Sequence, residues 1–263
     1  QGHRFIGNGA FKIRSPLEYE SQLAEHFVLA NRMDRQKTIW SALRSKAESL
    51  GGTITENDSL LDEVTALVEW PIILAGHFDE RFLRVPSEVL VSAMREHQRY
   101  FHLVDDAGSL LPIFLTVANV DSPEPEVVIK GNERVITPRL ADAEFFYDKD
   151  LKQAPIQWLE SLKRVTYQAE LGSYFEKAER LGSLSAQIAS RLGIDEASAQ
   201  RAGQLAKTDL VSGMVGEFPD LQGVMGEYYA RAAGEASNVS LAVREHYQPR
   251  FAGDALPSGE VSQ

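Results

Sequence analysis

Cysteine is absent from this chain of 263 residues. Its absence excludes disulfide bonds, thiolate nucleophiles and thiolate zinc sites. Apolar runs of membrane-spanning length are also absent, so we expect no membrane partner. The N-terminal sequence QGHRFIGNGAF has neither an initiator methionine nor the apolar segment of a signal peptide. We therefore expect an internal fragment of a longer, cytoplasmic protein.

Histidine is scarce, and phosphate-binding motifs are missing. None of the six histidines lies between His102 and His246, which argues against metal-dependent hydrolysis there because imidazole is the ligand that such sites need. No Gly-x-x-x-x-Gly-Lys loop and no Gly-x-Ser-x-Gly motif occurs. The glycines of residues 7–9 precede an expected strand instead of following one. We expect this chain to bind no cofactor or metal and to carry no catalytic residue.

Acidic residues outnumber basic ones by 38 to 27, and the net charge is -11. Nucleic-acid binding depends on Lys and Arg side chains that neutralise phosphates, so such a chain is a poor RNA binder on its own. Any contact with RNA must therefore be local. One local concentration of positive charge consists of Lys130, Arg134 and Arg139, here called the cationic cluster.

The cationic cluster belongs to residues 131–150, GNERVITPRLADAEFFYDKD, and to the lysine before them. The Gly-Asn pair and Pro138 predict a turn followed by a short amphipathic helix. Two roles are open for the cluster. It could contact RNA phosphates or acidic groups of another subunit, or it could pair inside the fold with Glu133, Asp142 and Glu144. We favour pairing, because most charges in proteins are solvated or locally paired.

Residues 1–150 show the pattern of a mixed α and β domain. Helix-capping residues and apolar stripes predict helices, whereas apolar, β-branched runs predict buried strands. A turn rich in Asp and Gly predicts a hairpin between the last two strands. The helices are expected to start at Ser15, near Asp34, near Asn57 and at Ser87, and the strands to cover 71–78, 100–104 and 110–120.

After Asp150 the strand signals stop, and we expect only helices. This change of pattern predicts two domains, 1–150 and 151–263, with the second truncated at its C-terminus. One helix carries apolar residues at a spacing of three or four, which predicts a buried bundle core. These residues are Leu181, Leu184, Ile188 and Leu192. The expected helices are 158–165, 175–192, 198–215, 221–232 and 239–247.

Six longer segments carry the most specific information. They are GHRF (2–5), EWPIILAGHFDERFLRVPSEVL (69–90), MREHQRYFHL (94–103), the 131–150 segment, AKTDLVSGMVGEFPDLQGVMGEYYA (206–230) and EHYQPRFAGDALP (245–257). In this order they resemble the beta subunit of the bacterial two-subunit (α2β2) glycyl-tRNA synthetase. The resemblance is collinear and covers nearly the whole chain, so a chance match of one short motif does not explain it.

The resemblance implies a role in attaching glycine to tRNA(Gly). In this family the class II aminoacylation centre belongs to the alpha subunit, so ATP and Mg²⁺ are expected there and not on this chain. The beta subunit supplies tRNA binding and assembly, which makes the alpha subunit and tRNA(Gly) the expected partners. The arginine and the glycine-rich strand that class II chemistry needs for ATP have no counterpart in this sequence.

The resemblance also implies folds. Residues 1–150 are similar to the editing-domain fold of phenylalanyl-tRNA synthetase beta chains, and residues 151–263 are similar to a His-Asp phosphohydrolase bundle. The bundle is expected to be degenerate, because Lys207-Thr208 precedes Asp209 where a histidine ligand would stand. Asp209 is then a structural residue that caps or pairs within the bundle. The alternative is a free-standing metal-dependent phosphohydrolase or aminoacyl-tRNA hydrolase built on the same folds.

Overall fold

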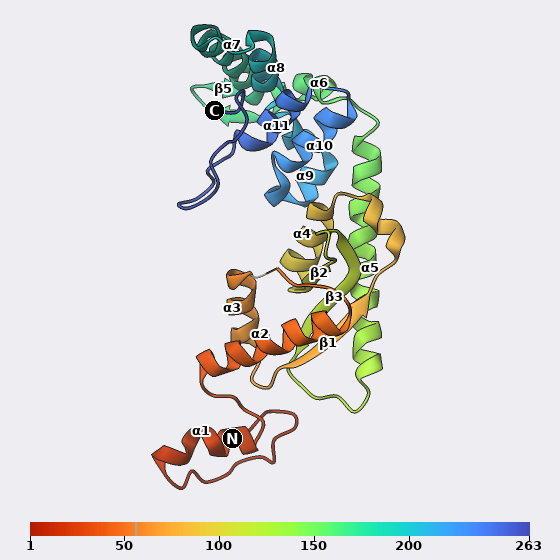
Figure 1. Cartoon of the computed structure of the whole chain (residues 1–263), viewed down its shortest axis with the longest axis vertical. Coiled ribbons are helices and arrows are strands. Elements are labelled where there is room, and N and C mark those ends of the chain that lie inside the picture. Colours follow the sequence, from red (N-terminus) through yellow and green to blue (C-terminus); the bar gives the residue numbers. More distant parts are fainter. Residues whose placement is uncertain (56) are drawn as a thin grey trace. The chain divides into compact units, whose positions relative to one another are not determined.

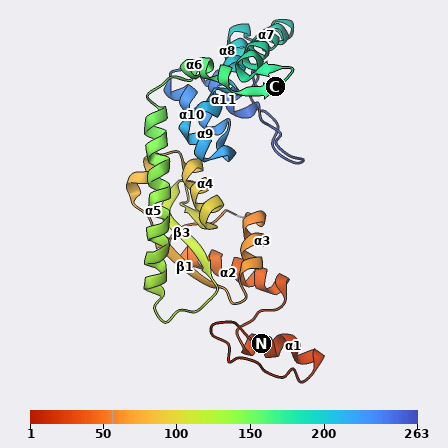
Figure 2. The ribbon, with the colours of Figure 1, turned by 180° about the vertical axis from the view of Figure 1, so that it is seen from behind.

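The computed structural model describes residues 1–55 and 57–263 (Figure 1). The chain is a mixed α+β protein, mostly helical with small antiparallel sheets, which confirms the predicted class. Internal contacts divide it into two compact units, Gln1–Ala141 and Asp142–Gln263. The division falls inside the long helix α5 (Pro125–Asp150), seen from the other side in Figure 2. The domain boundary expected at residue 150 stays a prediction.

The first unit is built around a three-stranded antiparallel sheet of β1 (Ile72–His77), β2 (Phe101–Val104) and β3 (Leu110–Ala118) in the order β1-β3-β2. The predicted β2–β3 hairpin is confirmed. Asp105 Oδ1 accepts the backbone N–H groups of Ala107 and Ser109 at 2.9 and 2.8 Å. The strand expected after residue 9 was wrong, because residues 10–15 form no regular element.

One face of this sheet carries the core of the first unit. Ile39 and Leu43 lie in one apolar cluster with Leu115 of β3. Phe114 points to the opposite face, because successive side chains of a strand alternate, and its ring stacks on that of Tyr100 at 4.4 Å. The expected helices are confirmed, except that Ser15 caps a short 3-10 turn. They are η1 (Pro16–Glu18) with α1 (Tyr19–Glu25), α2 (Arg32–Ser49), α3 (Asp58–Leu67) and α4 (Ser87–Gln98). The 3-10 helix η2 (Glu80–Arg84) was not predicted.

The structure corrects the interpretation of residues 131–150. No turn precedes a short helix there: α5 continues through Pro138 from Pro125 to Asp150 (Figure 2). A proline inside a helix costs about 3 kcal/mol. However, Ile136 and Leu140 of α5 are fully buried, and burial of such a side chain stabilises by about 1.5–3 kcal/mol. Packing of the buried side chains therefore outweighs the proline signal.

The second unit is a set of packed helices with one small hairpin. Only helices were expected in this part of the chain, so the hairpin of β4 and β5 was not predicted. The helix expected at 198–215 is also wrong, because α8 stops at Leu205 and a new helix starts at Gly213. The elements are α6 (Pro155–Trp158), η3 (Leu159–Arg164), β4 (Thr166–Gln168), β5 (Gly172–Ser173), α7 (Tyr174–Leu192), α8 (Glu196–Leu205), η4 (Thr208–Val211), α9 (Gly213–Glu217), η5 (Pro219–Leu221), α10 (Val224–Ala232) and α11 (Ser237–Glu245).

The buried side of α7 is not the predicted one. Leu184, Ile188 and Leu192 are 54%, 49% and 67% exposed. The side that packs on α8 consists of small residues instead, and a Cβ placed on Gly203 would lie 2.7 Å from the backbone nitrogen of Gly182. Close approach of two helix backbones needs small residues at the contact. The buried residues of α7 are Ala178, Gly182, Ala186 and Ala189.

Candidate functional site

The cationic cluster lies entirely on α5, but not on one face of it. Lys130 and Arg134 are exposed and stand one helical turn apart. Arg139 is half-buried and, at 100° per residue, is rotated by about 180° from Lys130. The sequence therefore places three cations close together, whereas the helix presents only two of them on a common surface.

Glu133 does not pair with the cationic cluster as expected. Glu133 Oε1 accepts the backbone N–H of His77 at 2.9 Å and lies 3.8 Å from His77 Nδ1, which ties α5 to β1. Within the described part of the chain, Lys130 and Arg134 have no side-chain hydrogen bond or ion pair. Their positive charges are therefore open to solvent. Whether they contact RNA or a subunit stays a prediction.

Asp209 is fully buried in the second unit. Its Oδ2 atom accepts the backbone N–H groups of Gly223 and Gly226 at 2.6 and 3.2 Å, at the N-terminus of α10. Burial raises the pKa of this carboxyl to about 6, against the opposing effect of the two amides and of Lys207. Asp209 therefore caps α10 from a distant turn, and its assignment as a degenerate His-Asp position stays a prediction.

A second buried carboxylate, Asp150, was missed in the sequence. Its oxygens accept the backbone N–H groups of Gly213 and Met214 at 3.0 and 2.9 Å, and the Tyr229 hydroxyl at 2.9 Å. Burial, followed by the nearby Asp150 charge, raises the pKa of Tyr229. This arrangement fixes the end of α5 to α9 and α10. Because the partners lie far away along the chain, no local pattern could have shown it.

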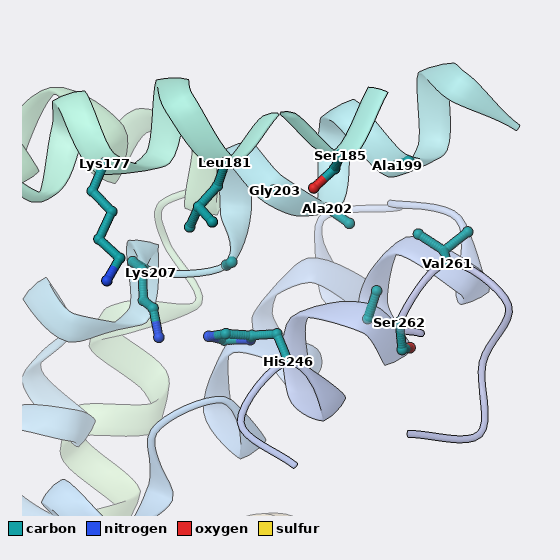
Figure 3. Close-up of a pocket in the computed structure, with 12 residues that line it drawn as sticks. Lys177, Leu181, Ser185, Ala199, Ala202, Gly203, Lys207, His246, Val261 and Ser262 are labelled. Atoms are coloured by element: carbon teal, nitrogen blue, oxygen red, sulfur yellow. The ribbon is translucent and has the colours of Figure 1, made fainter. Parts of the chain in front are cut away.

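A pocket of about 300 Å³ opens between α7, α8, the link from α8 to η4, α11 and the C-terminal segment. Its polar groups include Lys177, Lys207 and His246, none of which was a predicted site residue (Figure 3). Figure 3 shows the Lys207 ammonium and the His246 ring pointing toward one another, with the Lys177 ammonium on the same side. Side chains with strongly shifted pKa values therefore line this cavity, which makes it a candidate ligand site.

Burial and mutual repulsion set the ionisation of these groups. Burial, and then the charge of Lys177, lower the pKa of Lys207 to about 8, opposed by Asp209. Burial, and then the charge of Lys207, lower the pKa of His246 to about 3. At neutral pH the pocket therefore holds a neutral imidazole next to two ammonium groups. The sequence analysis singled out the Lys207-Thr208-Asp209 segment, but only because it lacks a histidine before Asp209. The lysine itself was not considered as a site residue.

In the described part of the chain, no group of three or more His, Asp and Glu side chains could hold a metal ion. Among the described helices, none combines the length and the apolar character needed to cross a membrane.

Comparison with known proteins gives a consistent result. The glycyl-tRNA synthetase beta subunit family matches residues 1–263. The glycine–tRNA ligase beta subunit of Neisseria meningitidis serogroup C (strain 053442) is 48% identical over 262 residues, which are 99% of this chain and 38% of that protein. The beta subunit of Marinobacter nauticus is 49% identical over 260 residues, and that of Aeromonas hydrophila 48% over 263, covering 98% and 100% of this chain. The chain spans 38% of the length of each of these relatives.

Proposed function

Because the chain belongs to the glycyl-tRNA synthetase beta subunit family, we propose that it works as part of the beta subunit of a glycine–tRNA ligase. In this proposal it supports the ATP-dependent attachment of glycine to tRNA(Gly) through tRNA binding and through assembly with a catalytic alpha subunit. ATP and Mg²⁺ belong to that alpha subunit, and the enzyme is a cytoplasmic α2β2 heterotetramer. The match of the family over the whole chain carries the proposal.

The folds named by the resemblance form part of the same proposal. The first unit takes the role of an editing-like domain, supported by its sheet with helices packed on it. The second unit takes the role of a degenerate His-Asp bundle, supported by the buried Asp209 at the start of the 3-10 turn η4. A shared fold does not carry a shared activity. The three relatives described above are all beta subunits, so the free-standing hydrolase alternative gains no support from them.

Glycine-dependent pyrophosphate exchange tests whether catalysis belongs to the alpha subunit and not to this chain. The purified chain alone is expected to show no exchange, and addition of the alpha subunit together with the complete beta subunit is expected to restore it. Exchange above background by this chain without an alpha subunit would contradict the proposal. Co-purification of the complete beta subunit with the alpha subunit tests assembly separately.

We assign RNA or subunit contact to the two members of the cationic cluster that lie on the exposed face of α5. Lys130 and Arg134 present unpaired charges there, whereas Arg139 points elsewhere. In the complete two-subunit enzyme, Lys130→Ala with Arg134→Ala should weaken tRNA binding and flatten its salt dependence by about one unit per lost phosphate contact.

The control for this experiment is Arg139→Ala, which lies on the other side of the same helix. It is expected to leave the salt slope unchanged. The measurement is tRNA affinity at several salt concentrations, with thermal melting alongside. A double variant that melts lower but keeps the wild-type slope would mean that Lys130 and Arg134 do not contact phosphates.

A further inference from the structure

The pocket of the second unit contains two cations whose charges are not neutralised within it. Lys177 and Lys207 line it, and no Asp or Glu stands among the described residues of its wall. Asp209 does not line the pocket: its charge opposes the lowering of the Lys207 pKa, and its Oδ2 atom accepts the backbone N–H groups of Gly223 and Gly226. Two ammonium groups that face the same cavity without a carboxylate create a local preference for an anion.

Aromatic rings hold both lysines without removing their charge. The Lys207 ammonium lies 3.7 Å from the centroid of the Tyr247 ring, and the Lys177 ammonium lies 3.6 Å from that of Tyr167. Cation–π contacts of this kind orient an ammonium group and stabilise it weakly. Lys177 also hydrogen-bonds the Tyr167 side chain, which uses one of its three donor hydrogens. The other donor hydrogens of the two lysines stay available to a ligand, and the side chains lose little freedom when it binds.

His246 adds an acceptor to the two donors. Its Nδ1 atom lies 2.7 Å from the carbonyl oxygen of Val243, so Nδ1 carries the proton and donates it. The other nitrogen, Nε2, is buried and has no hydrogen-bond partner among the described residues. A buried acceptor without a partner costs free energy, and a ligand that brings a donor hydrogen removes this cost.

We propose that this pocket binds a phosphate group that bears a hydroxyl or a protonated oxygen. The oxygens of the phosphate accept hydrogen bonds from Lys177 and Lys207, and its hydroxyl donates to Nε2 of His246. The volume of about 300 Å³ lies at the lower end of the range of small-ligand pockets, so the site holds a phosphate and little more than the sugar attached to it. The inference is independent of the role in glycine–tRNA ligase, because it concerns binding by this chain alone.

The first test is calorimetric titration of the 263-residue chain with inorganic phosphate at constant ionic strength. Saturable one-to-one binding is expected. Lys207→Gln and Lys177→Gln should each weaken it by about tenfold, the size expected for one charge-assisted hydrogen bond. The control is Lys152→Gln, which replaces an exposed lysine of the same unit and should change nothing. Absence of saturable binding, or equal weakening by the control, overturns the proposal.

Thermal melting keeps the test valid if a variant folds poorly. Phosphate should raise the melting temperature of the wild-type chain in a saturable way, and this shift should disappear in each lysine variant that melts cooperatively. If Lys207→Gln fails to fold, Lys177→Gln alone decides, because its side chain is only half-buried. A full phosphate-induced shift in Lys177→Gln would then overturn the proposal.

Competition distinguishes the sources of the phosphate. Adenosine 5′-monophosphate and a short RNA with or without a 5′-phosphate are added to the phosphate-bound chain. Displacement by the mononucleotide assigns a nucleotide ligand, and displacement only by the phosphorylated RNA assigns an RNA end. Displacement by neither assigns free phosphate. Equal displacement by the RNA that lacks the terminal phosphate would show that the pocket does not select a phosphate group bearing a hydroxyl.

Discussion

The hydroxyl of Tyr229 donates a hydrogen bond of 2.9 Å to Oδ2 of Asp150, and so joins α10 to the last residue of α5. The same carboxylate accepts the backbone N–H groups of Gly213 and Met214. Three chain segments therefore depend on one buried acid. Loss of the acid leaves three buried donors without an acceptor, and such groups are costly to bury.

Removal of the two partners should show strong coupling. Tyr229→Phe loses one hydrogen bond to a charged acceptor and should cost about 1.5 kcal/mol, whereas Asp150→Ala should cost about 3 kcal/mol or more. The double variant should cost less than the sum by about 1 kcal/mol, because the shared hydrogen bond is lost only once. The measurement is urea unfolding followed by the fluorescence of Trp158, which lies in the same unit, with Trp40 and Trp70 replaced by Phe. Strict additivity of the two substitutions would show that this hydrogen bond contributes nothing.

Much of the first unit follows from local sequence. The β2–β3 hairpin has a turn that Asp105 and Gly108 specify directly, and Gly108 has the positive φ of 79° that glycine tolerates. Likewise Asn57 caps α3 as its side chain predicts. The continuous helix α5 could not be predicted in this way, because the signal of Pro138 is local while the burial of Ile136 and Leu140 depends on the tertiary fold.

The exposed leucine-rich side of α7 gives a direct test of which face is buried. Leu184→Gln and Ile188→Gln should each change the free energy of unfolding by less than about 0.5 kcal/mol, as surface substitutions do. Ala178→Leu, on the buried side, should cost about 1–3 kcal/mol through overpacking. The same urea unfolding assay measures all three. A cost above about 2 kcal/mol for Leu184→Gln would restore the bundle-core interpretation.

Periodicity could not separate the two faces of α7. The apolar residues Leu184 and Ile188 repeat at helical spacing, but so do the small residues Ala178, Gly182 and Ala186. A hydrophobicity pattern favours the larger side chains. The structure instead buries the side that lets α7 approach α8 closely, and close approach is a property of the pair of helices.

The contact between α7 and α8 should be sensitive to one methyl group. A Cβ on Gly203 would lie 2.7 Å from the backbone nitrogen of Gly182, so Gly203→Ala forces the two helices apart. We expect a loss of about 1–3 kcal/mol, the usual cost of overpacking. Gly216→Ala is the matched control, because a Cβ there meets nothing within 4 Å, and it should be neutral or stabilising by up to about 1 kcal/mol. Equal melting temperatures for the two variants would contradict the close contact.

The candidate site was predictable only in part. Lys130, Arg134 and Arg139 stand out because they are neighbours in sequence, but the helix separates Arg139 from the others. The pocket with Lys207 and His246 was not found, because its residues come from segments far apart in the chain. Only the fold shows that a lysine and a histidine share a cavity.

Asp209 should make the stability of the second unit fall as the pH rises from about 4 to about 6. Its pKa is raised by burial from 3.8 to about 6 in the folded chain, so the folded state keeps a proton that the unfolded state has already lost. The stabilisation is complete below the unfolded pKa and is lost as the pH passes through the folded pKa, an effect of about 3 kcal/mol. Asp209→Asn keeps an acceptor for the two amides of α10 and removes this titration.

The free energy of unfolding of Asp209→Asn minus that of the wild type should therefore rise by about 2.5 kcal/mol between pH 4 and pH 7. Urea unfolding by Trp158 fluorescence at each pH measures it. Asp195→Asn is a control of opposite sign: the hydrogen bond from the Ser198 hydroxyl lowers the pKa of Asp195, so its carboxylate stabilises the fold at higher pH, and the corresponding difference should fall as the pH rises. A flat difference for Asp209→Asn would mean that the pKa of this carboxyl is the same in the folded and the unfolded chain, which would contradict the effect of burial.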